Sequence, residues 1–247
     1  MKQLLCGVIL IALNALAHGQ GIPKTITLAS TDWCPYVCDQ RPEQPGIVYE
    51  YLTLILKEHG INLKVEFNPW HESVKKANLG QVHGLLTATK DEAPELLFTT
   101  TPTANYQVCF ITKRDQNWLY KDTNSLYGIH LGSIKGYGYG EDVDQYIKDY
   151  AQNPNMHIIE SGGIERLNDM LFSDDINAFL DDSLVVLWLL RDKNVKVKLA
   201  GCLERKPFFL AVHPELPWAN EFMQLMNKIL KEAVNRRTLH SIKLKYR

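Results

Sequence analysis

The chain has 247 residues, of which 45% are hydrophobic and 22% are charged, with 15 glycines and 11 prolines. These are the proportions of ordinary globular proteins, so they exclude a wholly disordered, collagen-like or coiled-coil chain. The 27 basic and 28 acidic residues give a net charge of -1 without any basic run, which argues against nucleic acid as a partner.

The first 17 residues have the three parts of an export signal. Lys2 is a short positive start, residues 4–16 are almost unbroken apolar sequence, and Ala15-Leu16-Ala17 is a small-x-small cleavage box. A membrane anchor or a buried helix is the alternative, but a spanning helix needs about 20 apolar residues. We expect residues 1–17 to be a signal peptide cleaved near Ala17, and the mature protein to be exported to the periplasm.

The next part of the chain alternates short strands with amphipathic helices. Gly46 opens the first helix, and Gly60 and Gly80 follow the last turns of the first and second. A β-α-β-α-β series of this kind closes most simply as a parallel sheet with helices on its faces. The expected strands are 25–29, 63–67 and 82–88, and the expected helices are 46–56 and 70–77.

A second α/β series follows, and two helices are left over at the end of the chain. Strands are expected over 129–134, 157–159, 176–180 and 195–199, helices over 143–151, 164–171, 184–190 and 218–233, with a shorter helix to the C-terminus. Residues 105–114 and 199–212 connect the two series. We therefore expect two lobes joined by two crossing strands, with a ligand cleft between them. Residues 18–111 and 207–247 would form lobe 1, and residues 112–206 lobe 2.

Four cysteines remain after Cys6 is removed with the signal peptide. In an oxidising compartment they favour disulfides, and four cysteines allow three pairings. A bridge between Cys34 and Cys38 is feasible because they are close together in a turn-rich stretch, and Cys109 and Cys202 fall near the two crossings, where a second bridge could form. The histidines are scattered and provide no pair at zinc spacing, so we expect no metal.

Six motifs in order resemble the extracellular solute-binding proteins of family 3, the polar amino-acid receptors of ABC importers. The most informative is GLLTATKDEAPELLFTTTP, from Gly84 to Pro102; the others include LYGIHLGSIKGYGYG, INAFLDDSLVVLWLL and TLHSIKLKY. The resemblance extends over nearly the whole mature chain. It implies a two-lobed periplasmic binding protein of the α/β class, with each lobe a mostly parallel sheet flanked by helices, that closes around a small polar solute.

The resemblance also implies aromatic walls for the ligand. Trp33 or Tyr36 in the first loop and Trp70 at the second helix match the family's aromatic positions, and an indole face can hold a cation. Trp70 could equally be a core residue, and Trp33 a loop residue packed on its own disulfide.

Polar contacts are implied at three further places. Thr87 and Thr89 match contacts to a ligand carboxylate, although both are also ordinary strand residues. The turn Gly136-Tyr137-Gly138 opens a helix whose N–H groups could hold an anionic oxygen. Asp182 matches the aspartate that pairs with a ligand ammonium, and it could also cap the following helix.

Glu92 departs from the family pattern, because the family has a carboxylate-clamping arginine there. Lys90 lies two residues earlier and could reach over, but a lysine cannot form the bidentate contact of an arginine. A cationic or uncharged ligand is therefore as plausible as an amino acid.

Three functions remain open from the sequence. The first is a receptor that delivers a small polar solute to the permease of an ABC importer, and the second is a receptor that reports the solute to a membrane sensor. The third is a dehydratase-like enzyme that would use Glu92, His83 or Asp182 as its acid or base. We expect a monomeric binding protein with no catalytic residues and no cofactor.

Overall fold

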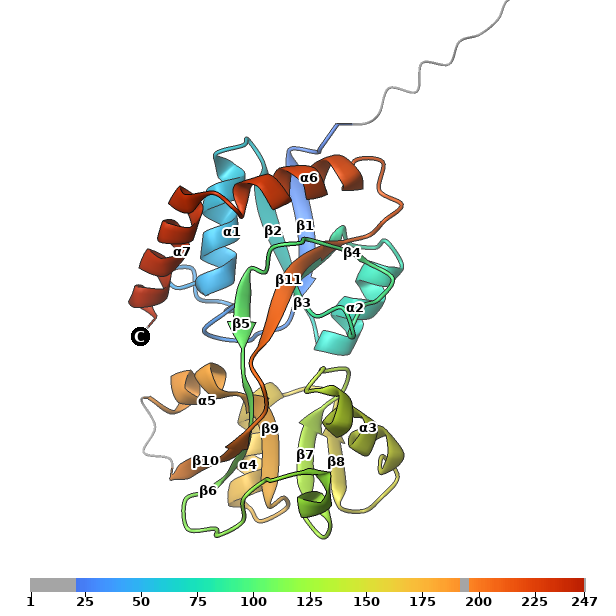
Figure 1. Cartoon of the computed structure of the whole chain (residues 1–247), viewed down its shortest axis with the longest axis vertical. Coiled ribbons are helices and arrows are strands. Elements are labelled where there is room, and N and C mark those ends of the chain that lie inside the picture. The colour runs from blue at the N-terminus through green and yellow to red at the C-terminus, as the bar shows by residue number, and fades with distance from the viewer. Residues whose placement is uncertain (1–20, 192–195, 247) are drawn as a thin grey trace, which may run out of the picture.

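Two β-sheets, each with its own helices, make up the protein (Figure 1). The computed structural model describes residues 21–191 and 196–246. The expected signal peptide and its cleavage site lie outside this part of the chain. Within the described part, no helix combines the length and the apolar character needed to cross a membrane.

The first sheet combines the N-terminal strands with one strand from near the C-terminus. Its strands are β1 (Thr25–Ser30), β2 (Asn62–Phe67), β3 (Gly84–Ala88), β4 (Leu97–Phe98), β5 (Ala104–Tyr106) and β11 (Lys206–Val212). They lie in the order β2-β1-β3-β11-β4, and β5 pairs with β11. The pairs of β1 with β2 and β3 are parallel, as the β-α-β-α-β pattern predicts, whereas β11 is antiparallel to its neighbours.

Four helices pack around the first sheet: α1 (Ile47–Lys57), α2 (Trp70–Asn78), α6 (Ala219–Ile229) and α7 (Ala233–Lys245). The predicted apolar stripe of α1, including Tyr51 and Leu52, is buried. Gly46 stands before α1 with φ 108°, and a β-carbon there would lie 2.5 Å from the Tyr36 carbonyl oxygen, so the turn into the helix requires glycine. At the end of the chain, α6 packs against β4 and α7 against α1.

The second sheet has the order β10-β6-β9-β7-β8. Its strands are β6 (Val108–Lys113), β7 (Leu131–Ile134), β8 (Met156–Ile159), β9 (Ala178–Asp182) and β10 (Val197–Cys202). The helical segments of this half are η1 (Thr123–Leu126), α3 (Glu141–Asp149), α4 (Gly163–Phe172) and α5 (Ser183–Leu190). The strand predicted over 176–180 begins and ends two residues later in the structure, so that both Asp181 and Asp182 lie at its end.

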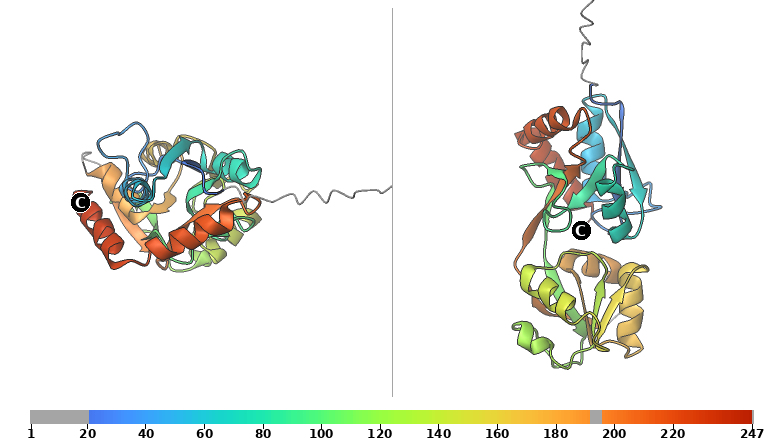
Figure 2. Two further views of the ribbon diagram at one scale, coloured as in Figure 1. Left: turned by 90° about the horizontal axis from the view of Figure 1, so that it is seen from above. Right: turned by 90° about the vertical axis from the view of Figure 1, so that its right-hand side faces the viewer.

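The chain passes from one sheet to the other at Gln107 and returns at residues 203–205 (Figure 1). The Gln107 Nε2 donates a hydrogen bond to the Leu203 carbonyl oxygen at 3.1 Å, which ties the two crossings together. Both crossings lie at one side of the molecule, as the right-hand view of Figure 2 shows.

We propose that the lobes divide at these crossings. The expected boundary after residue 111 falls inside β6, because β6 continues unbroken from the crossing and pairs with β9 and β10. The expected boundary after residue 206 coincides with the start of β11, and the two C-terminal helices lie with the first lobe.

Each lobe contains one disulfide in the part of the chain that the structure describes. Cys34 is bonded to Cys38 in the loop before α1, with their Cα atoms 4.8 Å apart. Cys109 is bonded to Cys202 across β6 and β10, with their Cα atoms 4.0 Å apart. The second bridge therefore ties the two strands of the second lobe that lead to the crossings.

Candidate ligand-binding site

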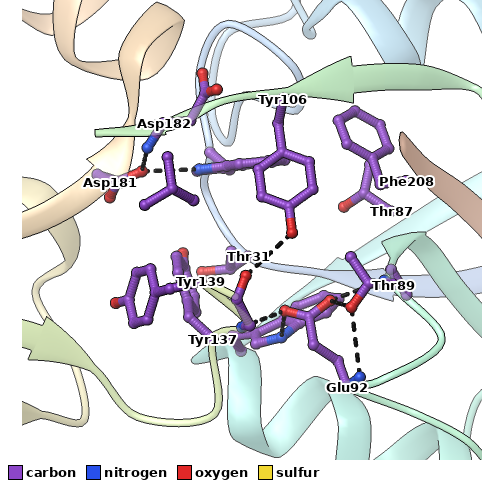
Figure 3. A pocket seen from close by; sticks show the side chains of 15 residues that line it. Thr31, Thr87, Thr89, Glu92, Tyr106, Tyr137, Tyr139, Asp181, Asp182 and Phe208 are labelled. Atoms are coloured by element: carbon purple, nitrogen blue, oxygen red, sulfur yellow. Dashed lines mark hydrogen bonds between the residues drawn. The ribbon is translucent and has the colours of Figure 1, made fainter. Parts of the chain in front are cut away.

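A cavity lies between the two lobes, where strands of both sheets end (Figure 3). The first lobe contributes Thr31 after β1 and residues 87–89 at the end of β3, and the second lobe contributes residues 137–139 after β7 and residues 181–182 at the end of β9. The free space inside the cavity is about 40 Å³, well below the volume of most small-molecule sites, so a ligand would require the lobes to move apart. The carboxyl ends of the parallel strands thus form the two walls, as the sequence predicts.

Aromatic rings cover much of both walls. Trp33 lines the cavity, while Tyr36 lies behind it with ring centroids 4.6 Å apart and donates its hydroxyl to the Asn105 carbonyl oxygen at 3.1 Å. Across the cleft Trp70 meets Tyr137 edge to face at 6.4 Å. Of the two candidates in the first loop, Trp33 is the one that lines the cavity. Trp70 is a buried residue and also forms part of the cavity wall.

The carboxylate of Glu92 is held by four donors from both lobes (Figure 3). Its Oε2 accepts from the Thr89 backbone N–H at 2.8 Å and from the Thr89 hydroxyl at 2.9 Å. Its Oε1 accepts from the Trp70 Nε1 at 3.0 Å and from the Gly138 N–H at 2.9 Å. Burial raises the pKa of Glu92, and the hydrogen bonds from Thr89 and Gly138 oppose this shift.

Asp182 is occupied by the protein itself. Its Oδ1 accepts from the N–H groups of Leu184 and Val185 at 2.9 and 3.1 Å, which caps α5. Its Oδ2 accepts from the N–H of Gln107 at 2.7 Å, so the same carboxylate holds one of the two crossings. Asp182 lines the cavity, but these three hydrogen bonds leave its capping role as the one that the geometry supports.

Asp181, the preceding residue, has a free oxygen. Its Oδ1 accepts from the Trp33 Nε1 at 3.3 Å and from the Asp182 N–H at 2.6 Å. Its Oδ2 is buried and has no hydrogen-bond partner among the described residues. The pKa of Asp181 is raised to about 7, chiefly by burial; the hydrogen bonds from the Asp182 N–H and Trp33 oppose this shift, and the charges of Asp182 and Glu165 add to it. A buried carboxylate oxygen that accepts no hydrogen bond is energetically costly, so a donor to this atom would be stabilising.

Of the remaining residues predicted from the sequence, some line the cavity and others lie outside it. Thr87 lines the cavity. Lys90 is exposed and lies over the Phe209 ring, 6.0 Å from its centroid, and is absent from the cavity lining. Gly136 backs onto His71, and Tyr137 and Gly138 line the cavity. His83 precedes β3 at the end away from the cleft, where its Nδ1 accepts from the Thr27 N–H at 2.9 Å.

Several residues of the cavity were not predicted from the sequence. Asp181 stands beside the predicted Asp182, and Tyr139 belongs to the glycine-rich motif after β7, so the ends of β9 and β7 are the sequence signal for both residues. Tyr106, Val108 and Phe208 come from the crossings, where only the pairing of β5 with β11 brings them to the cavity. The unpredicted lining residues are Thr31, Ala88, Tyr106, Val108, Tyr139, Asp181 and Phe208.

Charge in the cavity is one-sided. Among the described residues that line it, three are acidic and none is basic. In residues 21–191 and 196–246, no group of three or more histidine, cysteine, aspartate or glutamate side chains is placed to hold a metal ion. The site as described offers aromatic faces, carboxylates and hydroxyl groups to a ligand.

We expect Asp182→Ala to lower the free energy of unfolding by about 2–4 kcal/mol, because it removes a helix cap and leaves the N–H of Gln107 without its acceptor. Asp122→Ala is the matched control, since Asp122 caps η1 at an exposed position. It should cost about 1 kcal/mol or less. Urea unfolding of the two variants measures both values, and equal losses would contradict the role given to Asp182.

The fold is that of the two-lobed periplasmic binding proteins, which confirms the α/β fold class expected from the sequence. An ancestral arginine-binding protein bound to glutamine is similar with a TM-score of 0.74 at 18% identity, over 91% of this chain and 98% of that one. An amino acid ABC transporter substrate-binding protein from Streptococcus pneumoniae bound to L-arginine has a TM-score of 0.71 at 17% identity, over 90% and 94%.

A histidine kinase sensor domain with similarity to periplasmic binding proteins has a TM-score of 0.73 at 15% identity, over 90% of this chain and 95% of that one. No protein-family model and no curated protein match the chain. These neighbours agree with the resemblance to family 3 of the solute-binding proteins, and at such identities they establish the fold.

Proposed function

We propose that the protein is an exported receptor that closes around a small polar solute and presents it to the permease of an ABC importer. The observation that carries the proposal is a cavity whose two walls belong to different lobes and are already joined by hydrogen bonds. Trp33 of the first lobe donates to Asp181 of the second, and Gly138 of the second donates to Glu92 of the first. Movement about the two crossings would open and close this cavity.

The comparisons support a binding function rather than an enzymatic one. Two of the neighbours named above are amino-acid-binding proteins, one of them from an ABC transporter. The acid–base candidates of the enzyme alternative are also poorly placed for catalysis. Glu92 is saturated by four donors, Asp182 by three, and His83 lies away from the cleft. We therefore propose that the protein is not an enzyme.

A sensing role is the second candidate. The observation that favours it is the structural similarity to a histidine kinase sensor domain, which extends over 95% of that domain's chain. Delivery and sensing use the same closed state, so both are compatible with the cavity. Crosslinking of the closed protein in cells, followed by identification of the membrane partner, separates a permease from a sensor.

Native mass spectrometry of the protein purified from the periplasm tests the binding function. We expect an added mass of a small solute that is lost in Trp33→Ala and kept in Trp118→Ala. Trp118 is the matched control because its ring packs on Phe110 and its Nε1 donates to Ser125, in the second lobe and off the cavity lining. The captured solute at 100 times its dissociation constant should stabilise the wild type by about 2.7 kcal/mol. A folded protein that carries no solute and gains no stability from periplasmic extract would contradict the proposal.

A further inference from the structure

Glu92 occupies a carboxylate site that spans the cleft. Three of its four partners, the backbone N–H groups of Thr89 and Gly138 and the indole N–H of Trp70, can only donate hydrogen bonds. The set therefore requires an acceptor with two oxygens, and a carboxylate fits it. A β-carbon at Gly138 would stand 3.0 Å from Glu92 Cγ, so the close approach of the carboxylate depends on this glycine.

A carboxylate brought by a ligand would have to compete with Glu92 for these donors. Charge-assisted hydrogen bonds of this kind are among the strongest in proteins. A displaced Glu92 would also remain in a cavity that already contains Asp181 and Asp182 and has no basic residue among its described lining. Adding a like charge to such a cavity is unfavourable, so the site opposes a second carboxylate.

Among the described residues that line this cavity none is basic, while Arg41 and Arg191 line the adjoining cavity, which Asp181 also borders. The Asp181 Oδ2 is buried and accepts no hydrogen bond from residues 21–191 and 196–246. The aromatic side chains of Trp33 and Tyr137 line the cavity together with Asp181. An ammonium or guanidinium group would supply both the missing donor and the charge, and the ring faces would stabilise it further.

We propose that Glu92 supplies in the protein the carboxylate that an amino acid would bring, and that the ligand is an amine or guanidine cation without a carboxylate, held by Asp181 between aromatic rings. This inference rests on the proposed receptor function and narrows it to one class of ligand. Glu92 determines the specificity by filling the acid-binding half of the cavity, and Asp181 binds the cation in the other half.

Pairs of compounds that differ in the carboxylate test the inference without any substitution. Calorimetry on the exported protein compares agmatine with arginine and cadaverine with lysine. Agmatine and cadaverine should bind at least ~10-fold more tightly than the amino acids. This difference in affinity corresponds to the loss of one hydrogen bond to a charged group. Argininamide, which has the size of arginine but no carboxylate, distinguishes repulsion from lack of space and should bind more tightly than arginine.

Glu92→Ala should reverse the preference. With the four donors free, arginine should gain at least ~10-fold in affinity relative to agmatine. Acetate at millimolar concentration should restore the preference for agmatine by refilling the vacated donors. Glu95→Ala is the matched control, because Glu95 is an exposed glutamate three residues away that takes no part in the cavity. If Glu92→Ala does not fold, the wild-type comparison decides alone.

The outcomes are distinct. Arginine bound by the wild type as tightly as agmatine would overturn the inference and leave the receptor function standing. A folded wild type that binds none of these compounds but carries a different solute from the periplasm would also overturn it. No binding of any solute at all would overturn the proposed function together with the inference.

Discussion

Asp181→Asn is expected to weaken the binding of agmatine about 100-fold, because a cation in a buried cavity then loses its charged partner while a neutral amide keeps the shape of the side chain. Calorimetry at pH 8 measures the loss, since Asp181 is ionised in the wild type at that pH. Asp169→Asn, an exposed aspartate on α4 of the same lobe, is the control and should leave the affinity unchanged. Equal affinities of Asp181→Asn and the wild type would contradict the assignment of the cation to Asp181.

The same residue predicts how binding depends on pH. The pKa of Asp181 is raised to about 7, and a cation requires the ionised form. Affinity for agmatine should therefore rise about tenfold per pH unit from pH 5 towards 7 and level off above it. Other charged groups face this region, namely Asp182 and Glu165 beside Asp181, and Asp32, Arg41 and Arg191 around the adjoining cavity. Comparison with Asp181→Asn, whose curve should be flatter over this range, isolates the part due to Asp181.

The free protein should show the opposite dependence in its stability. The folded pKa of Asp181 is above the ordinary value of 3.8, so the folded state binds the proton more tightly than the unfolded state. The contribution of Asp181 is fully present below about pH 3.8, falls as the pH rises, at a slope of no more than about 1.4 kcal/mol per unit, and is lost above pH 7. The difference between wild type and Asp181→Asn in urea unfolding should follow this course. A difference that does not change between pH 4.5 and 7.5 would contradict it.

The second large effect is expected from the disulfides. Cys109–Cys202 joins positions 93 residues apart, whereas Cys34–Cys38 joins positions four residues apart. In the chain-entropy account the long loop contributes about 4–5 kcal/mol to stability and the short one about 2 kcal/mol. Replacing each pair by alanines and measuring urea unfolding should therefore give the larger loss for Cys109–Cys202. Equal losses would contradict the entropic account for this protein.

Much of the fold could be predicted because its elements have strong local patterns. The apolar stripe of α1 repeats at three and four residues and is buried in the structure. The alternation of strand and helix predicts the parallel pairing of β1 with β2 and of β7 with β8. In contrast, β4 and β5 are two and three residues long and owe their existence to pairing with β11, whose residues lie 100 or more positions later. Such short strands have no periodicity of their own.

The site was harder to predict, because its essential contacts join distant parts of the chain. The sequence places Glu92 where an arginine is expected, and this departure indicates an unusual ligand. It does not indicate that the carboxylate is bound by Gly138, which lies 46 residues further on and in the other lobe. The roles of Asp181 and Asp182 also depend on which N–H groups lie within reach, and these come from α5 and from the crossing at Gln107.

A crystal structure of the protein with agmatine tests the central claim most directly. We predict the ligand between the lobes, with an N–H donor within about 3.2 Å of the Asp181 Oδ2 and with Glu92 still bound to the N–H groups of Thr89 and Gly138. Agmatine outside this cleft, or bound in it with Glu92 displaced from these donors, would contradict the account.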